Sequence, residues 1–125
     1  MLIGGFSIHL FNGAGYLWGN IAAYVISYYY HFGTSEQELD LYYAVYYAPI
    51  LTFTLMFANP MGAFLARIIS PGLLIMIGNL IGVLATWFAL SMPTFNWFMF
   101  MFAFVKTIGV GLCYFPPLIC GWEWF

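Results

Sequence analysis

The chain has 125 residues, of which 65% are hydrophobic and only 5% are charged. An ordinary globular domain carries about 25% charged residues, so this composition excludes a soluble chain that must cover itself with a polar surface. The net charge of −2 provides no basic patch to neutralise phosphates, which argues against nucleic acid as a partner.

Four apolar segments follow one another along the chain, and each is long enough to cross a bilayer. A span needs about 20 mostly apolar residues to cross roughly 30 Å of hydrocarbon. The sequence therefore predicts an all-α, multi-pass membrane protein in which residues 1–125 form a single domain of four transmembrane helices. The predicted spans are residues 2–30, 41–66, 73–90 and 96–115, with a polar loop at 31–40 and a short tail at 116–125.

The first predicted span carries no charge, but His9, Asn12 and Asn20 interrupt it. It lacks the basic region and the small-residue cleavage site of a signal peptide, so we expect a helix of the mature protein. The loop 31–40 that follows holds three of the four acidic residues. Within it, Thr34 or Ser35 followed by Glu38 resembles a capping box that opens the second helix.

Prolines mark the remaining helices. Pro49 and Pro60 are expected kinks in the second span, and the Pro71–Gly72 pair in RIISPG makes a tight connection to the third. Pro116 and Pro117 are expected to end the fourth span.

The loops are short, so neighbouring helices should be antiparallel. Arg67, the one basic residue near a span end, nominally places the 67–72 loop, both termini and Glu123 on the inner face and the acidic loop on the other. Aromatic residues beside the acidic loop and near the C-terminus suit interfacial belts or, as the alternative, ligand stacking. They are Tyr28, Tyr29, Tyr30, Tyr42, Tyr43, Tyr46, Tyr47, Trp122 and Trp124.

Small residues at helical spacing predict close packing between these helices. Gly15 with Gly19, Gly62 with Ala66, and Gly78 with Gly82 fit the small-xxx-small pattern, which lets helix backbones approach in lipid. Gly109 and Gly111 flatten one stretch of the fourth helix. These patterns indicate a helical bundle without identifying it.

Lys106 lies about ten residues into the fourth span, where an ammonium group costs roughly 2.5–3.5 kcal/mol on insertion scales. It needs a partner, a route to water, or deprotonation. Asn12 falls at a similar depth and His9 about a turn nearer the inner face, so both are candidate neutral acceptors. No carboxylate lies within the spans, so another molecule supplies an ionic partner or Lys106 has none. Lys106, Asn12 and His9 are thus candidate binding residues for an anion, and the alternative is a snorkelling lysine.

Constellations that carry catalysis are missing, and we predict no enzyme activity. His9 and His31 lie on opposite sides of the membrane and cannot share a metal, so no metal site is predicted. Cys113 and Cys120 are too few for a disulfide framework and are expected to act as small apolar side chains. No cofactor is predicted, although bound lipids are expected.

Two end motifs suggest a family. GGFSIHLFNGAGYLWGNIAAYVISYYY (residues 4–30) resembles the first helix of major facilitator superfamily transporters, in the branch with oxalate/formate antiporter-like and monocarboxylate-porter-like proteins. GLCYFPPLICGWEWF (111–125) resembles the end of that branch's fourth helix. The resemblance covers the whole chain and implies helices one to four of an N-terminal six-helix half.

The loop between helices two and three departs from the superfamily pattern of a glycine, three residues, an acid, a basic residue, and then a glycine and further basic residues. Here it reads GAFLARIISPG, in which Gly62 and Arg67 match. Ala66 occupies the place of the acid, Ile69 that of the second glycine, and Ser70 and Pro71 those of later basic residues. In the family this loop is implicated in gating, and alanine can neither pair with a cation nor stabilise a helix N-terminus. Lys106 matches no transferable substrate-binding position.

Three functions follow as hypotheses. The first is a truncated, transport-inactive relative that serves as an accessory subunit of a larger membrane complex, with a mitochondrial respiratory complex in the inner membrane as the expected setting. Its partners would be other membrane subunits, which cover the faces left by missing helices, and lipids. The second is a transporter, or part of one, for small organic anions such as monocarboxylates. The third is a small receptor, lipid-binding protein or assembly factor. Four helices cannot alone enclose a midplane transport site, which favours the first.

Overall fold

The computed structural model describes residues 2–33 and 41–122, and these residues form helices and connections with no strand among them. The all-α prediction is therefore confirmed for the described part of the chain. The elements in order are α1 (Leu2–Gly13), η1 (Ala14–Leu17), α2 (Trp18–Phe32), η2 (Leu41–Tyr46), α3 (Tyr47–Leu65), α4 (Pro71–Leu90), α5 (Phe95–Met99), η3 (Phe100–Val105) and α6 (Lys106–Trp122). η1 and η2 are 3₁₀ turns and η3 is a π-helical turn.

Three helical stretches are long and apolar enough to cross a membrane: Tyr42–Leu65, Pro71–Leu90 and Phe95–Trp122. They correspond to the predicted second, third and fourth spans. Their length and composition are those of helices in integral membrane proteins. The predicted first span forms α1, η1 and α2 without a break, but it is not among the three. His9, Asn12 and Asn20 make this stretch more polar than the others. The four-span count stays a prediction.

The helix of the predicted fourth span continues past residue 115, where the sequence predicts its end. α6 runs through Pro116 and Pro117 to Trp122, so the prediction of a tail beginning at residue 116 is wrong. Proline cannot donate the hydrogen bond to the carbonyl one turn earlier, yet helices in lipid tolerate it where neighbouring helices pack around the site. Pro116 is one such position, because its side chain is fully buried.

Some predictions fall on residues that the structure does not describe. The capping box and the three acidic residues of the loop lie within 34–40, and Glu123 and Trp124 follow the end of α6. These predictions lie outside the described residues.

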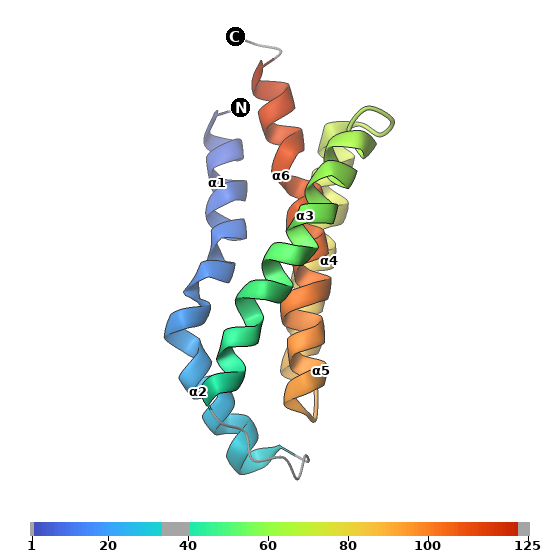
Figure 1. Cartoon of the computed structure of the whole chain (residues 1–125). Helices are drawn as coiled ribbons and strands as arrows, with labels where there is room; N and C mark the ends of the chain where they lie inside the picture. Colours follow the sequence, from blue (N-terminus) through green and yellow to red (C-terminus); the bar gives the residue numbers. More distant parts are fainter. Residues whose placement is uncertain (1, 34–40, 123–125) are drawn as a thin grey trace.

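The bundle has the expected alternation of helix directions. Figure 1 shows the start of α1, the end of α6 and the connection from α3 to α4 at one end of the molecule. The α2 end, η2 and the turn from α4 to α5 lie at the opposite end. Arg67 is exposed in the α3–α4 connection, at the end where the N-terminal helix begins.

Glycines set the packing of α6, which lies against both α3 and α4. A Cβ at Gly62 would lie 2.8 Å from the carbonyl oxygen of Gly111, and a Cβ at Gly109 would lie 2.5 Å from that of Gly78. A Cβ at Gly111 would collide with Ala58. Helix backbones therefore touch on two sides of α6, as the small-residue pattern predicts for helices in lipid.

The predicted pair of Gly15 and Gly19 does not pack in this way. Gly15 is buried, and a Cβ there would lie 3.1 Å from the hydroxyl oxygen of Tyr47. Gly19 is exposed, and a Cβ there would have no atom within 4 Å. The 3₁₀ turn η1 contains Gly15 and ends before Gly19, which shifts the two glycines off a common helical face.

An aromatic cluster closes the end of the bundle opposite the N-terminus. Its core contains Trp18, Tyr29 and Tyr47 with Phe95, Phe98 and Phe102. The indole of Trp18 donates to the carbonyl of Ala44 at 3.0 Å, and the Tyr29 hydroxyl donates to that of Met92 at 3.0 Å. The tyrosine belt prediction fits the exposed Tyr28, Tyr30, Tyr42 and Tyr46. It is wrong for Tyr29 and Tyr47, because each is buried in this cluster.

Candidate functional site

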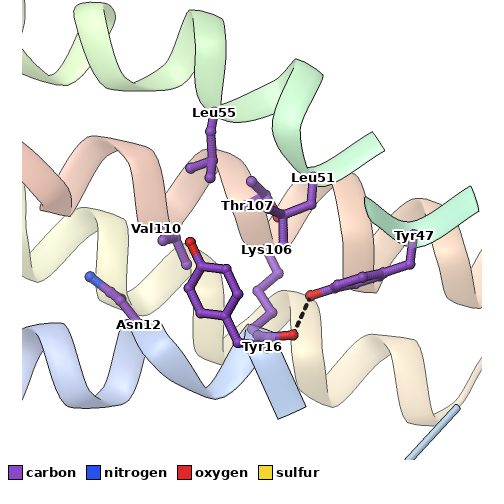
Figure 2. Close-up of a pocket in the computed structure, with 9 residues that line it drawn as sticks. Asn12, Tyr16, Tyr47, Leu51, Leu55, Lys106, Thr107 and Val110 are labelled. Atoms are coloured by element: carbon purple, nitrogen blue, oxygen red, sulfur yellow. Dashed lines mark hydrogen bonds between the residues drawn. The ribbon is translucent and has the colours of Figure 1, made fainter. Parts of the chain in front are cut away.

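A small cavity lies where α1, α3 and α6 meet. Its volume is about 30 Å³, which is room for one or two water molecules. Its walls come from α1 and η1 on one side and from α3 and α6 on the others (Figure 2). The lining residues are Asn12, Gly15 and Tyr16 from α1 and η1, Tyr47, Leu51 and Leu55 from α3, and Lys106, Thr107 and Val110 from α6.

Lys106 is the charged residue of this cavity and is only 9% exposed. It begins α6 directly after the π-helical turn η3, and such turns occur frequently at functional sites. Its ammonium nitrogen lies 4.1 Å from the centroid of the Phe102 ring, one turn earlier. This cation–π contact contributes about 0.5–2 kcal/mol. The sequence has no Asp or Glu between residues 41 and 122, so the spans offer Lys106 no carboxylate.

Asn12 lines the cavity together with Lys106. The sequence predicts the two residues at similar depths in their spans. It is 8% exposed, and its amide nitrogen Nδ2 is buried with no hydrogen-bond partner among the described residues. A buried polar group without a partner costs about 1–3 kcal/mol. The cavity therefore contains a donor group that a small polar ligand or a water would satisfy.

His9 lies nearer the start of α1 and does not line the cavity. Its ring packs edge-on against Tyr114, with ring centroids 5.1 Å apart, and its Nε2 is buried without a hydrogen-bond partner among the described residues. Tyr114 lies two turns beyond Lys106 on α6, about 12 Å along the helix axis. The structure thus brings Asn12 to Lys106 and leaves His9 apart.

Sequence reasoning missed three polar groups of the cavity. Tyr47 was assigned to the membrane interface, but its hydroxyl donates to the carbonyl oxygen of Gly15 at 3.1 Å. The hydroxyl groups of Tyr16 and Thr107 also line the cavity. The available signal was spacing, because Tyr16 follows Asn12 by one helical turn and Thr107 is adjacent to Lys106.

The expected gating loop lies away from this cavity. Gly62 packs in the α3–α6 interface, Ala66 caps the end of α3, and Arg67 is exposed beyond it. Packing against Gly111 and Leu112 is sufficient reason for glycine at position 62.

A second hollow of about 540 Å³ opens on the outside of the bundle. Its walls come from η2 and α3 on one side and from α5 and η3 on the other, and most of them are apolar or aromatic. They comprise Tyr43, Tyr46, Ile50, Phe95, Asn96, Met99, Phe100 and Phe104.

The described residues contain no group of three or more His, Cys, Asp or Glu placed to hold a metal ion. Cys113 and Cys120 are free, and the buried thiol of Cys113 donates to the carbonyl oxygen of Ile75 at 3.2 Å. No family model, curated protein or solved structure matches the chain.

Proposed function

We propose that this chain is a transport-inactive, transporter-like membrane protein that acts as a structural subunit of a larger membrane complex. The observation that supports this proposal is the size of the cavity at Lys106. About 30 Å³ admits a water or two and excludes organic solutes of the size of lactate or oxalate. A transporter must hold its solute between moving bundles near the midplane, and the glycine contacts leave α6 packed directly on α3 and α4.

The proposal includes a fourth span formed by α1, η1 and α2. At about 1.5 Å per residue this stretch exceeds the roughly 30 Å of the hydrocarbon core. Large apolar side chains point outward from its first half, namely Ile3, Phe6 and Leu10. We also propose that the chain is related to the major facilitator superfamily, on the strength of the motifs at residues 4–30 and 111–125.

The outward faces of the described helices are strongly apolar. Phe53, Phe57 and Phe64 of α3 and Met76, Leu80 and Trp87 of α4 are all more than half exposed. Lipid covers such faces in a free-standing bundle, and neighbouring subunits cover part of them in a complex. Neighbouring membrane subunits and lipids are therefore the partners that we propose.

Gentle detergent extraction followed by a native gel tests the subunit proposal. We expect the chain to migrate with one large complex in a fixed ratio to its other subunits. Migration as a free species, or in a variable ratio, would contradict it. The mitochondrial inner membrane and a respiratory complex stay predictions, and cell fractionation tests them directly.

The second candidate is a transporter, or part of one, for small organic anions. The observation that favours it is the buried Lys106, whose cavity contains donors and no carboxylate. Uptake of radiolabelled formate, lactate or oxalate into liposomes that contain the correctly inserted protein would support it and would remove the first proposal. The absence of uptake is the result that we expect.

A further inference from the structure

We propose that the Lys106 cavity binds one small monovalent anion, of the size of chloride or formate, as the counter-ion of a lysine buried in the membrane. This site does not depend on the subunit proposal, because all its walls belong to this chain. The anion would remain bound whether the protein is free or held in a complex.

The chemistry of the cavity walls favours a negative charge. Lys106 supplies an ammonium group that lies over the Phe102 ring, and residues 2–33 and 41–122 contain no carboxylate side chain to pair with it. Asn12 supplies a buried N–H group without a partner among the described residues. Thr107 and Tyr16 add hydroxyl groups to the lining. An anion would balance the charge of Lys106, whereas a cation would be repelled by it.

The size of the cavity limits the ligand to one small ion. A space of about 30 Å³ holds one or two waters, and a single halide or formate ion is of comparable size. A dicarboxylate such as oxalate, or a polyhydroxylated anion such as gluconate, needs several times that space. The site is therefore expected to discriminate by size as well as by charge.

The burial of Lys106 favours a free ion over a carboxylate from a partner helix. Lys106 is 9% exposed, and Phe102 and Tyr47 lie packed on the side of the cavity toward the aromatic cluster. Tyr16, which Figure 2 shows among the lining residues, is 78% exposed. A carboxylate on a side chain of a partner helix would have to pass these lining residues to reach the same position.

The test is thermal unfolding of the full-length protein in lipid nanodiscs at constant ionic strength, with sodium gluconate replaced stepwise by sodium chloride, formate or oxalate. Constant ionic strength cancels general screening. We expect chloride and formate to raise the Tm by about 5 °C for each tenfold increase above the Kd, and oxalate to have no effect. Equal responses to all anions, or no response to chloride and formate, would overturn the proposal.

Two variants assign the response to this cavity. Lys106→Gln should abolish the chloride-dependent shift, whereas Arg67→Gln should retain it, because Arg67 is the other basic residue and is exposed. If Lys106→Gln fails to fold, Asn12→Leu provides the test, with an expected loss of about tenfold in affinity for chloride. The anion would bind elsewhere if Lys106→Gln or Asn12→Leu kept the full response. The same conclusion would follow if Arg67→Gln lost it.

Discussion

The two sides of α6 differ in how they are packed. Toward α3 and α4, backbone lies against backbone, and Gly62, Gly78, Gly109 and Gly111 leave no room for a side chain between the helices. Toward α1, the interface contains a cavity and two buried polar atoms, Nε2 of His9 and Nδ2 of Asn12, without partners among the described residues. The side toward α3 and α4 is a closely packed interface. The side toward α1 contains buried polar atoms without hydrogen-bond partners among the described residues.

This difference has a physical cause in the membrane. Lipid tails are as apolar as leucine, so helices in lipid associate through close packing and hydrogen bonds rather than through the hydrophobic effect. The glycine side provides close packing. The α1 side provides mainly polar groups. The hydrogen bond from Tyr47 to Gly15 holds η1, directly after α1, and the aromatic cluster holds α2.

The largest expected effect concerns the charge on the loosely packed side. Lys106→Leu should improve membrane insertion of the fourth predicted span by about 2.5–3.5 kcal/mol, because an ammonium group no longer enters the hydrocarbon core. Glycosylation mapping of the inserted fraction measures it. Attachment to the partner complex should be unchanged. Weaker attachment in this variant would show that a partner supplies an acid to Lys106, and it would contradict the small-anion site.

The glycine side gives the next largest effect. Gly78→Ala should cost about 1–3 kcal/mol of unfolding free energy, because its Cβ would collide with the sulfur of Cys113 and lie 2.7 Å from the carbonyl of Gly109. Gly82→Ala is the matched control one turn along α4, where a Cβ has no atom within 4 Å. It should be neutral or stabilising by up to about 1 kcal/mol. Denaturant titration of both in detergent separates them, and equal effects would mean that α4 and α6 are not in backbone contact.

The smallest expected effect concerns the anchor of the α2 end. Tyr29→Phe removes the hydrogen bond to the Met92 carbonyl and should cost about 0.5–1.5 kcal/mol. Tyr30→Phe, at the exposed neighbouring position, should change stability little. The same titration compares the two variants. A cost for Tyr30→Phe as large as that for Tyr29→Phe would argue against the buried position of Tyr29.

The sequence was most informative where a single physical requirement dominates. Apolar length located the second and third predicted spans and the start of the fourth to within two residues, and the small-residue spacing located Gly62 and Gly78 in interfaces. It failed at Pro116 and Pro117, because the packing that keeps a proline-containing helix intact comes from other helices. It also failed at Tyr29 and Tyr47, because the same residue type serves both a membrane interface and a buried hydrogen bond.

The candidate site was predicted in part for a similar reason. Depth along the helices paired Lys106 with Asn12, since depth follows from residue counting. Counting could not show that His9 turns toward Tyr114 instead, because this depends on the angle between α1 and α6. Nor does residue counting reveal the π-helical turn before Lys106, which depends on the local hydrogen-bond pattern.

Native mass spectrometry of the gently solubilised protein tests the subunit proposal most directly. We expect the 14.2 kDa chain to be released, on activation, from one large assembly of constant mass and stoichiometry. Detection of the chain only as a monomer, or as a ring of identical copies, would contradict this proposal and would return a transporter or a small independent membrane protein to first place.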